Sequence, residues 1–328
     1  MDDTDRGFQR CVGDLSYLVY PVQNKSLAGA FQRSGRKVCA PMKSIVLFNP
    51  KSGSVPADAR NRLVSVLREA GINGADLIET DPEHCEKQLK ELADTAPDLF
   101  VVWGGDGTIR SALSIVGPIT PNLLILPGGT MNLLPRSIHG EKAWDAVLRD
   151  VLKGPKLKML SAGEVNGERF YCAMMAGAPA HFAEARESIR RGDLAKAAQQ
   201  TGAAIEVLKT MHLRATYGDG YSFGDTALPT SSFVGAIIGS LTKAGKGMEV
   251  ASLANPTTTG AMNVVWTSFF TDWRNAPGVE VAPATSLDIG EEGGGDIPVI
   301  ADGEHMPSAP QLHVIFVESA SRCLAASE

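Results

Sequence analysis

The sequence has no long apolar run. No window reaches the roughly eighteen consecutive apolar residues that a helix needs to cross a bilayer. The chain starts with Met1-Asp2-Asp3-Thr4-Asp5, which is acidic where a secretory signal peptide is basic. We therefore expect a soluble, cytoplasmic protein whose membrane association, if any, is peripheral contact with the inner membrane face.

Cysteine is scarce and histidine is scattered. The five cysteines are odd in number and include no Cys-x-x-Cys pair, which favours a reduced compartment over a disulfide framework. The six histidines include no pair at the spacing of helical metal ligands. A zinc site is therefore not expected.

A surplus of basic residues is also missing. The 31 Lys and Arg residues are outnumbered by 37 Asp and Glu residues, which gives a net charge of −6. This balance argues against a nucleic-acid-binding protein and gives no general attraction to anionic membranes. Any membrane contact has to come from a local patch, and the oligomeric state stays open.

What the sequence does contain is an alternation of short apolar runs and helical patterns from residue 44 onward. The apolar runs are Ser44–Phe48, Asp76–Thr80, Asp98–Trp103 and Asn122–Leu126. Strands that alternate with helices at this spacing predict a doubly wound parallel sheet. We assign residues 44–156 to this α/β domain and residues 1–43, which lack a sustained period, to an N-terminal extension.

Beyond Gly154-Pro155 the pattern changes to short extended pieces separated by turn residues. Residues 157–320 are therefore expected to form an antiparallel, sandwich-like β domain, whose end is free to return to the first domain, and residues 321–328 a tail. Asn166-Gly167 predicts a hairpin with a type I′ turn. The expected strands are 162–165, 169–175, 213–217, 232–238, 262–267, 286–289 and 312–317.

One helical stretch interrupts this half, from about residue 182 to 211, with a break expected near Gly192. It combines apolar residues near helical spacing with Arg186, Arg190, Arg191 and Lys196. Two interpretations stay open: an interfacial helix that meets the bilayer, and a helix that packs on its own domain.

The stretch Gly104-Gly105-Asp106-Gly107-Thr108 joins the third predicted strand to a helix that we expect to start near Thr108. Glycines let a backbone approach a phosphate closely, and the unpaired N–H groups at a helix N-terminus stabilise anions. Taken alone, the motif is equally compatible with an ordinary strand–helix turn in which Asp106 or Thr108 caps the helix.

Two further loops follow strand ends. Asn49-Pro50-Lys51-Ser52-Gly53 follows the first strand, Gly128-Gly129-Thr130-Met131-Asn132 follows the fourth, and Thr80 ends the second. Each loop could be a simple turn, because its residues are turn formers. However, ligands of such sheets bind at the carboxyl ends of the strands. Backbone amides, the Lys51 ammonium and the nearby hydroxyls would position and neutralise a phosphoryl group there.

These motifs resemble the ordered motif set of the diacylglycerol kinase catalytic family, which includes bacterial lipid kinases, sphingosine kinases and ceramide kinases. The matching pieces are Asn-Pro-x-Ser-Gly, Gly-Gly-Asp-Gly-Thr, Pro-x-Gly-Thr-x-Asn and the late Ala301-Asp302-Gly303-Glu304. The resemblance implies an α/β nucleotide domain and a β-rich lipid-binding domain with the active site between them. It also implies a kinase that uses ATP and Mg²⁺ to phosphorylate a lipid hydroxyl of diacylglycerol, a sphingoid base or ceramide.

The resemblance implies roles for individual residues. The family's nucleotide contacts fall on Asn49, Ser52, Gly53, Thr80, Gly104, Gly105, Asp106, Gly107, Thr108, Gly129, Thr130 and Asn132. Pro50, Lys51 and Gly128 complete the same loops, and Asp106 would lie beside Mg–ATP. The late motif falls on Asp302 and Glu304 and makes Glu304 the candidate general base, since the attacking alcohol gives up a proton. From the residues alone, the late motif is a β-turn between two strands.

Two departures separate this sequence from the family pattern. Leu133-Leu134 follows Asn132 where the family commonly has Asp-Phe, and residues 255–263 lack the family's aspartates. The second departure argues against the structural metal site of some bacterial members and suggests a divergent lipid preference. The alternative functions are an NAD kinase, which shares Gly-Gly-Asp-Gly-Thr, and a catalytically silent lipid-binding or regulatory protein on the same fold.

Overall fold

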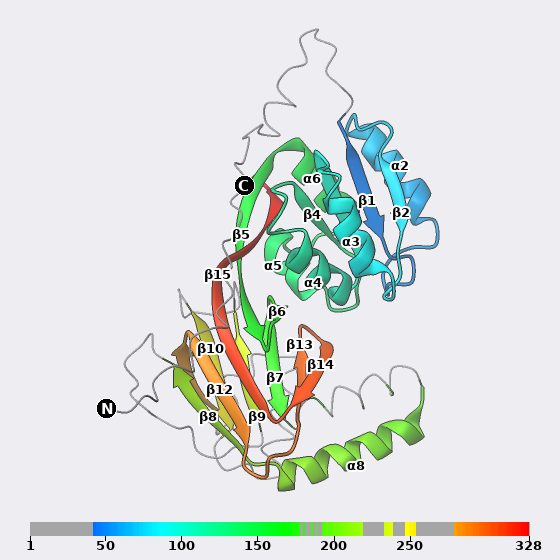
Figure 1. The fold of residues 1–328 in the computed structure, drawn as a ribbon. Coiled ribbons are helices and arrows are strands. Elements are labelled where there is room, and N and C mark those ends of the chain that lie inside the picture. Colours follow the sequence, from blue (N-terminus) through cyan, green and yellow to red (C-terminus); the bar gives the residue numbers. More distant parts are fainter. Residues whose placement is uncertain are drawn as a thin grey trace, which may run out of the picture. The chain divides into compact units, whose positions relative to one another are not determined.

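Four parallel strands form the first sheet of the computed structural model (Figure 1). They are β1 (Ser44–Phe48), β2 (Asp76–Glu79), β3 (Leu99–Gly104) and β4 (Leu123–Pro127), in the spatial order β2-β1-β3-β4. β1 and β3 are buried along their whole length, so their residues are apolar without alternation. The predicted α/β sheet is confirmed.

The structure describes residues 42–177, 180, 185, 188, 192–218, 233–238, 247–253 and 279–327. Residues 40–328 form one unit, and the preceding unit, which holds most of the predicted N-terminal extension, lies outside the described residues. The predicted strand 262–267 and the divergent stretch 255–263 also lie outside them.

The helices between and after the parallel strands each bury an apolar stripe. They are α2 (Ala59–Glu69), α3 (Cys85–Ala93), α4 (Asp106–Ile115), α5 (Leu133–His139) and α6 (Trp144–Lys153). On α2, for example, Leu63, Val66 and Leu67 face the core. Trp144 ties α6 to the sheet, because its ring stacks on that of fully buried Trp103 with 4.2 Å between the centroids.

Two antiparallel sheets make up the second half of the described chain. One has the order β11-β10-β9-β7-β13-β14 and the other β6-β5-β15-β12-β8. Their buried residues, such as Leu213, Val250, Leu287 and Val299, form one cluster, so the predicted sandwich-like arrangement is confirmed. The strands are β5 (Pro155–Val165), β6 (Glu168–Phe170), β7 (Ala173–Gly177), β8 (Leu213–Gly218), β9 (Phe233–Ile237), β10 (Met248–Leu253), β11 (Val279–Ala284), β12 (Ser286–Glu291), β13 (Ile297–Ala301), β14 (Glu304–Ala309) and β15 (Gln311–Ala326).

The predicted hairpin at Asn166-Gly167 is present, with φ of 49° and 90° at its two turn residues. Its return strand, expected as one piece over residues 169–175, is instead divided. β6 stays in the sheet of β5, whereas β7 belongs to the other sheet. The chain therefore crosses from one sheet to the other at Tyr171 and Cys172.

Some elements of this half differ from the sequence-based expectation. β10 and β11 were not predicted. In β10 the polar residues Glu249 and Ser252 are buried, so the sequence lacks the alternation of apolar and polar residues that predicts a strand. The described part of the helical stretch is α8 (Leu194–Thr210). Gly192, with a φ of 79°, precedes it at the predicted break.

Strand β15 links the antiparallel sheets to the parallel sheet (Figure 1). Its first part pairs with β12 and β5, and its last part pairs with the beginning of β5 after a register shift between Val317 and Ser321. Residues 321–326, expected as a tail, are therefore strand. Cys323 joins the core beneath the parallel sheet, and the Ser321 hydroxyl donates to the Leu113 carbonyl of α4 at 2.9 Å.

The packing between β5 and β6 predicts the effect of a single methyl group. Gly163 lies opposite buried Phe170, and a Cβ there would fall on the Phe170 ring and 2.6 Å from Ile238 Cδ1. We expect Gly163→Ala to lower the free energy of unfolding by about 1–3 kcal/mol, because the core is overpacked. Urea unfolding measures this change. The control is Gly290→Ala in β12, where nothing lies within 4 Å of the added Cβ, and equal stability of the two variants would contradict the packing.

Candidate active site

Three loops meet at the carboxyl ends of β1, β3 and β4. The Gly105 N–H donates to Ser52 Oγ at 2.9 Å, which joins the loop after β3 to the loop after β1. The Ser54 N–H donates to the Gly128 carbonyl at 3.0 Å, which joins the loop after β1 to the loop after β4. Because β1 leads to β2 on one side and lies beside β3 on the other, this edge is the topological switch point of the sheet, where such folds bind ligands.

The glycines allow these loops to pack on one another. A Cβ on Gly128 would lie 2.8 Å from the Gly104 carbonyl oxygen, and one on Gly129 would lie 3.1 Å from the Gly105 Cα. A Cβ on Gly53 would lie 2.8 Å from Thr130 Oγ1. Side chains at these positions would separate the loops, so the glycines are required for the loops to meet.

Two helix N-termini point into the same place. α4 begins at Asp106, two residues before the expected start, because Gly105 is its N-cap in place of Asp106 or Thr108. α5 begins after Asn132, whose φ is 49°. The positive ends of both helix dipoles therefore lie beside the three loops, which favours an anionic ligand.

Asp106 connects the two helices. Its carboxylate accepts the Asn132 N–H at 3.3 Å and the Leu133 N–H at 3.2 Å. Burial raises the pKa of Asp106, and these backbone hydrogen bonds oppose the rise. Leu133, which stands where the family commonly has Asp, thus contributes its backbone N–H to the site.

The remaining loop residues divide into buried supports and exposed groups. Asn49 is buried, and its side-chain oxygen accepts the Lys51 N–H at 3.0 Å. Asn132 holds its loop through two hydrogen bonds with Gly129, of 2.7 and 2.8 Å. Pro50, Lys51 and Thr130 are exposed at the mouth of the loops, where a ligand can reach them.

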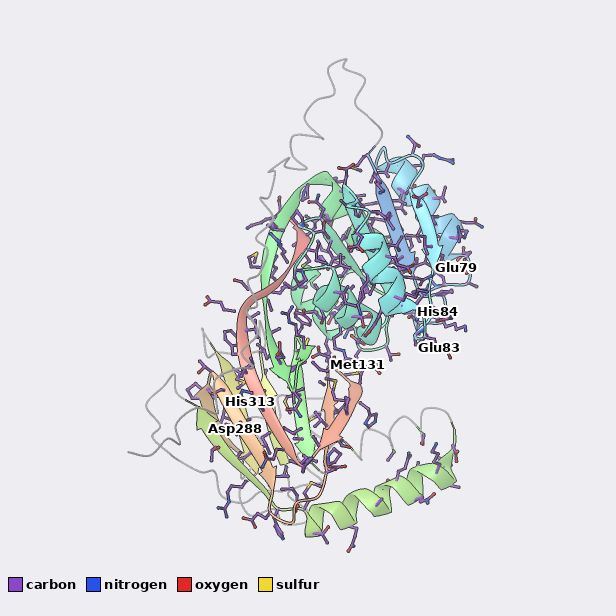
Figure 2. All side chains as sticks on the ribbon, in the orientation of Figure 1. Glu79, Glu83, His84, Met131, Asp288 and His313 are labelled. Atoms are coloured by element: carbon purple, nitrogen blue, oxygen red, sulfur yellow. The ribbon has the colours of Figure 1, made fainter. Side chains whose placement is uncertain are left out.

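Thr80 lies at the next strand end, outside these loop-to-loop contacts. It is buried, its N–H donates to the Phe48 carbonyl at 2.9 Å, and its hydroxyl donates to the Asp81 carbonyl at 3.3 Å. Figure 2 shows Glu79, Glu83 and His84 around this end of β2, and Met131 in the loop after β4. Thr80 therefore fixes the end of β2 at the edge of the site, through its hydrogen bonds to Phe48 and Asp81.

The late motif forms the tight turn between β13 and β14. Asp302 and Gly303 have φ of 51° and 87°, as in a type I′ turn, so the turn interpretation of the backbone is correct. The Asp302 carboxylate points inward and accepts the N–H groups of Tyr171, Cys172 and Ala173 at 2.7, 2.8 and 3.1 Å. Burial raises the pKa of Asp302, against the effect of these donors. The turn is thus held where the chain crosses between the sheets.

Glu304, the first residue of β14, is exposed. Its side chain lies beside the first turn of α4. A Cβ added to Gly107 would be 3.2 Å from Glu304 Oε1. The structure therefore brings the late carboxylate to the three loops, although nearly two hundred residues separate it from Gly107 in the sequence. Asp302 and Glu304 face different surroundings: Asp302 is buried among backbone donors, and Glu304 is open to solvent.

Arg110 is a residue of this region that the sequence analysis missed. It lies one turn after Asp106 on α4, and its Nη1 contacts Met306 Sδ of β14 at 2.7 Å. The charge of Arg110 also has a small lowering effect on the pKa of Asp302, which burial raises. The spacing of four residues from Asp106 places it on the same helix face, but nothing in the sequence indicates that this face meets β14.

The arrangement of three glycine loops, two helix N-termini and a late carboxylate agrees with a known family. Residues 43–165 match the family model described as the diacylglycerol kinase catalytic domain. The resemblance to this kinase family is confirmed. The match ends at the last residue of β5, so it covers the parallel sheet and the loops but not Glu304.

Two curated relatives support the same assignment. A "Putative lipid kinase" of Streptococcus pneumoniae is 28% identical over 135 residues, which are 39% of this chain and 44% of the relative. A "Diacylglycerol kinase" of Bacillus subtilis is 29% identical over 135 residues, which are 38% of this chain and 42% of the relative. The matched stretch spans less than half the length of each relative.

A solved structure of a diacylglycerol kinase from Bacillus anthracis extends the likeness to both halves of the fold. It is similar with a TM-score of 0.61 over 88% of this chain and 98% of that chain, at 17% identity. At 17% sequence identity, this structural similarity is evidence for a shared fold.

Metal and membrane features are limited in the described part of the chain. No group of three or more His, Cys, Asp and Glu side chains there could hold a metal ion. None of the helices that the structure describes is both long enough and apolar enough to cross a bilayer. Among the described cysteines, Cys85, Cys172 and Cys323 are buried and free.

The bonds of Asp302 predict a stability effect. In Asp302→Asn the amide keeps one acceptor oxygen but places an NH₂ group against backbone N–H donors. We expect a loss of about 1–3 kcal/mol in the free energy of unfolding, because buried N–H groups lose their partners. Thermal and urea unfolding measure it, with Asp296→Asn, at an exposed turn carboxylate, as the control. Equal stability of the two variants would show that Asp302 does not anchor the turn.

Proposed function

We propose that this protein is a lipid kinase that transfers the γ-phosphoryl group of ATP to a lipid hydroxyl. The observation that supports this best is the position of the solvent-accessible Glu304 carboxylate beside Gly107, where an added Cβ would lie 3.2 Å from Glu304 Oε1. In this proposal the loop that contains Gly107 binds phosphate. Phosphoryl transfer needs positioning and charge neutralisation more than covalent help. The loops supply the first two, and Glu304 supplies a proton acceptor.

In this proposal the three loops bind the nucleotide. The backbone N–H groups of Gly107 and Thr108 at the start of α4 face the phosphates, whereas those of Asn132 and Leu133 at the start of α5 are bonded to Asp106. The exposed Lys51 ammonium and Thr130 hydroxyl add polar contacts from the mouth of the site, and Thr108 adds its hydroxyl from α4. Ser52, Asn49 and Asn132 act through the loops that they brace. Arg110 provides a further positive charge on the side of α4 that faces β14.

Magnesium fits this site only through a small number of protein ligands. The Asp106 carboxylate lies among the three loops, where it accepts the Asn132 and Leu133 N–H groups at 3.3 and 3.2 Å. Mg²⁺ in kinases is typically held by one or two carboxylates together with substrate phosphates. Asp106 would hold it here, and the ion would neutralise charge on the phosphates.

We assign the two carboxylates of the late motif different roles. Glu304 accepts the proton of the lipid hydroxyl as that oxygen forms its bond to the γ-phosphorus and the bond to the ADP oxygen breaks. Asp302 has its oxygens occupied by three N–H groups and holds the turn that carries Glu304. Asp302 is thus a positioning residue in this mechanism.

The acceptor is the less defined substrate. We propose that the antiparallel region binds the lipid at the membrane surface, and that diacylglycerol is the first acceptor to test, since a relative carries that activity in its name. A sphingoid base and ceramide are the other lipid classes of the family. The stretch with Arg186, Arg190 and Arg191, our candidate membrane contact, lies outside the described residues.

A lipid-panel assay tests the proposed activity. The protein is incubated with γ-labelled ATP and Mg²⁺ and, separately, with micelles containing diacylglycerol, a sphingoid base or ceramide, and with soluble NAD. We expect label in phosphorylated diacylglycerol. Labelled NADP would identify an NAD kinase, and nucleotide binding without any labelled product would identify a silent binding protein, so either result would contradict the proposal.

A variant tests the base. We expect Glu304→Gln to lower kcat by at least about a hundredfold, because general-base catalysis typically contributes that much or more. ATP affinity, measured by calorimetry, should stay unchanged. Glu168→Gln, at an exposed carboxylate of β6, is the matched control and should keep full activity. An active Glu304→Gln enzyme would remove Glu304 from this role while leaving the kinase assignment intact.

A further inference from the structure

Arg110 on α4 has an unusual partner for a charged side chain. It is partly buried, and its Nη1 donates to the Met306 thioether sulfur at 2.7 Å. A thioether is a weak acceptor. Arg110 forms no ion pair with any carboxylate of the residues that the structure describes. Because a guanidinium that is partly removed from water costs free energy when no anion or oxygen acceptor compensates it, this arrangement needs a physical reason.

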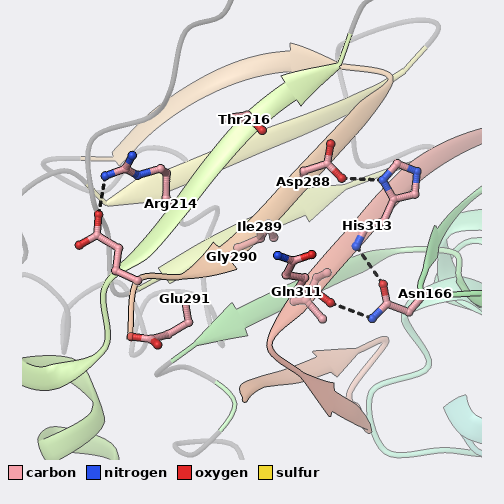
Figure 3. Close-up of a pocket in the computed structure, with 11 residues that line it drawn as sticks. Asn166, Arg214, Thr216, Asp288, Ile289, Gly290, Glu291, Gln311 and His313 are labelled. Atoms are coloured by element: carbon pink, nitrogen blue, oxygen red, sulfur yellow. Dashed lines mark hydrogen bonds and ion pairs between the residues drawn. The ribbon is translucent and has the colours of Figure 1, made fainter. Parts of the chain in front are cut away.

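Other partly buried arginines of the described chain have oxygen acceptors. Arg149 pairs with Asp145 at 2.6 Å, Arg169 donates to the Ala320 carbonyl at 3.2 Å, and Arg322 donates to the Pro118 carbonyl at 2.8 Å. Figure 3 shows a further example in a cavity of about 960 Å³ on β8, β12 and β15, where Arg214 pairs with Glu292 at 2.7 Å. Arg110 differs from these arginines because its acceptor is a sulfur atom.

Two carboxylates lie near Arg110, and both have other partners. Asp106 is four residues earlier on α4, the spacing at which an acidic residue and a following basic residue commonly pair. Its oxygens instead accept the Asn132 and Leu133 N–H groups. Asp302 is buried and accepts three backbone N–H groups. Neither carboxylate forms an ion pair with Arg110, so its charge stays available to an anion that is not part of the chain.

The Arg110 side chain borders the place of the proposed phosphoryl transfer. Gly107 and Arg110 are three residues apart on one face of α4, and Glu304 and Met306 are two residues apart on one face of β14. Glu304 lies beside Gly107, and Met306 contacts Arg110. The proposed base and the arginine thus occupy neighbouring positions where β14 meets α4. Because helical side chains lean toward the N-terminus of their helix, Arg110 can reach back over the first turn of α4.

We propose that Arg110 is a further catalytic residue, whose guanidinium leaves the Met306 sulfur and binds the γ-phosphoryl oxygens while that group passes to the lipid hydroxyl. This role rests on the lipid kinase function proposed above. The bond from the γ-phosphorus to the ADP oxygen breaks, the bond to the lipid oxygen forms, and Glu304 takes the hydroxyl proton. Arg110 keeps its own protons and neutralises charge on the transferring group.

The chemistry of both side chains suits this exchange. A planar guanidinium donates two parallel hydrogen bonds to a phosphoryl group, and such charge-assisted bonds are stronger than a bond to a neutral acceptor. The Met306 sulfur holds the guanidinium beside β14 but competes poorly with a phosphoryl oxygen, whereas a carboxylate would compete strongly. The contact between α4 and β14 therefore orients Arg110 without neutralising it.

Binding of a transition-state mimic tests this role without turnover. ADP with Mg²⁺ and aluminium fluoride imitates the phosphoryl group in transfer. Calorimetry compares its affinity for the full chain with that of ADP and Mg²⁺ alone, each in the presence of a short-chain diacylglycerol. We expect the wild type to prefer the fluoride complex. Arg110→Gln should reduce this preference at least about tenfold, since charge-assisted hydrogen bonds are lost, and should leave the ADP affinity unchanged.

Two further variants separate this role from a structural one. Arg68→Gln removes an exposed arginine in the last turn of α2 and should keep the full preference. Met306→Leu removes the sulfur at nearly constant volume and should also keep it, because Arg110 acts on the phosphoryl group and not on Met306. If the contact only fixed β14 against α4, Met306→Leu would weaken the preference as much as Arg110→Gln does, and this result would overturn the proposal.

The lipid-panel assay adds a kinetic measurement. We expect Arg110→Gln to lower kcat by about a hundredfold or more, which is the typical effect of removing one preorganised donor to a developing anion. The KM for the lipid should change little. Arg110→Lys should recover only part of the rate, since an ammonium group cannot donate the parallel pair of hydrogen bonds.

The results distinguish failure of this role from failure of the kinase function. A wild type that labels no lipid would contradict the kinase function, and with it the transfer step, even if the fluoride measurement showed that Arg110 binds a phosphoryl mimic. An Arg110→Gln enzyme with wild-type kcat and an undiminished preference would overturn the role of Arg110 and leave the kinase function intact. A wild type without any preference for the fluoride complex over ADP would also overturn this role.

Discussion

The site depends on the three hydrogen bonds that the Asp302 carboxylate accepts from Tyr171, Cys172 and Ala173. These donors lie where the chain leaves one antiparallel sheet and enters the other, so the backbone there has no regular strand partner for every N–H. A single buried carboxylate satisfies all three. The same bonds fix the β13–β14 turn, and the turn sets Glu304 against α4. The position of the proposed base thus follows from a local need to satisfy backbone donors.

The glycine loops illustrate a second constraint. Their glycines were interpreted from the sequence as allowing a phosphate to approach the backbone. The structure shows that close packing of the loops also needs them, because an added Cβ at Gly128 would meet Gly104 and one at Gly129 would meet Gly105. Both demands act on the same positions. Side chains of the same loops then fix the backbone, because Ser52, Asn132 and Asp106 accept N–H groups of Gly105, Gly129 and Leu133. Such preorganisation is what electrostatic stabilisation of phosphoryl transfer requires.

The sequence predicted the parallel sheet, its strand ends and the three loops well, because these features depend on local signals: buried apolar runs such as Leu99–Gly104 and turn residues directly after them. It predicted the antiparallel half less well. β10 buries Glu249 and Ser252, and the return strand of the Asn166-Gly167 hairpin divides between two sheets, which no local pattern indicates. The separate roles of Asp302 and Glu304, and the presence of Arg110, could not be predicted because they depend on which helix face meets which hairpin. Such long-range contacts are fixed by packing and leave no periodic signal.

The pairing of β5 with the last part of β15 has a consequence for the order of folding. The partners Leu157 and Leu324 are separated by most of the antiparallel half, and Cys323 belongs to the core beneath the parallel sheet. That core is incomplete until the chain has been synthesised through β15. The α/β half, although it comes first, must therefore wait for the C-terminal strand, and the loop-closure entropy of this long-range pairing is a term in the folding rate. During synthesis the nascent α/β half exposes apolar surface for longer than a self-contained domain would, which favours aggregation of the incomplete chain.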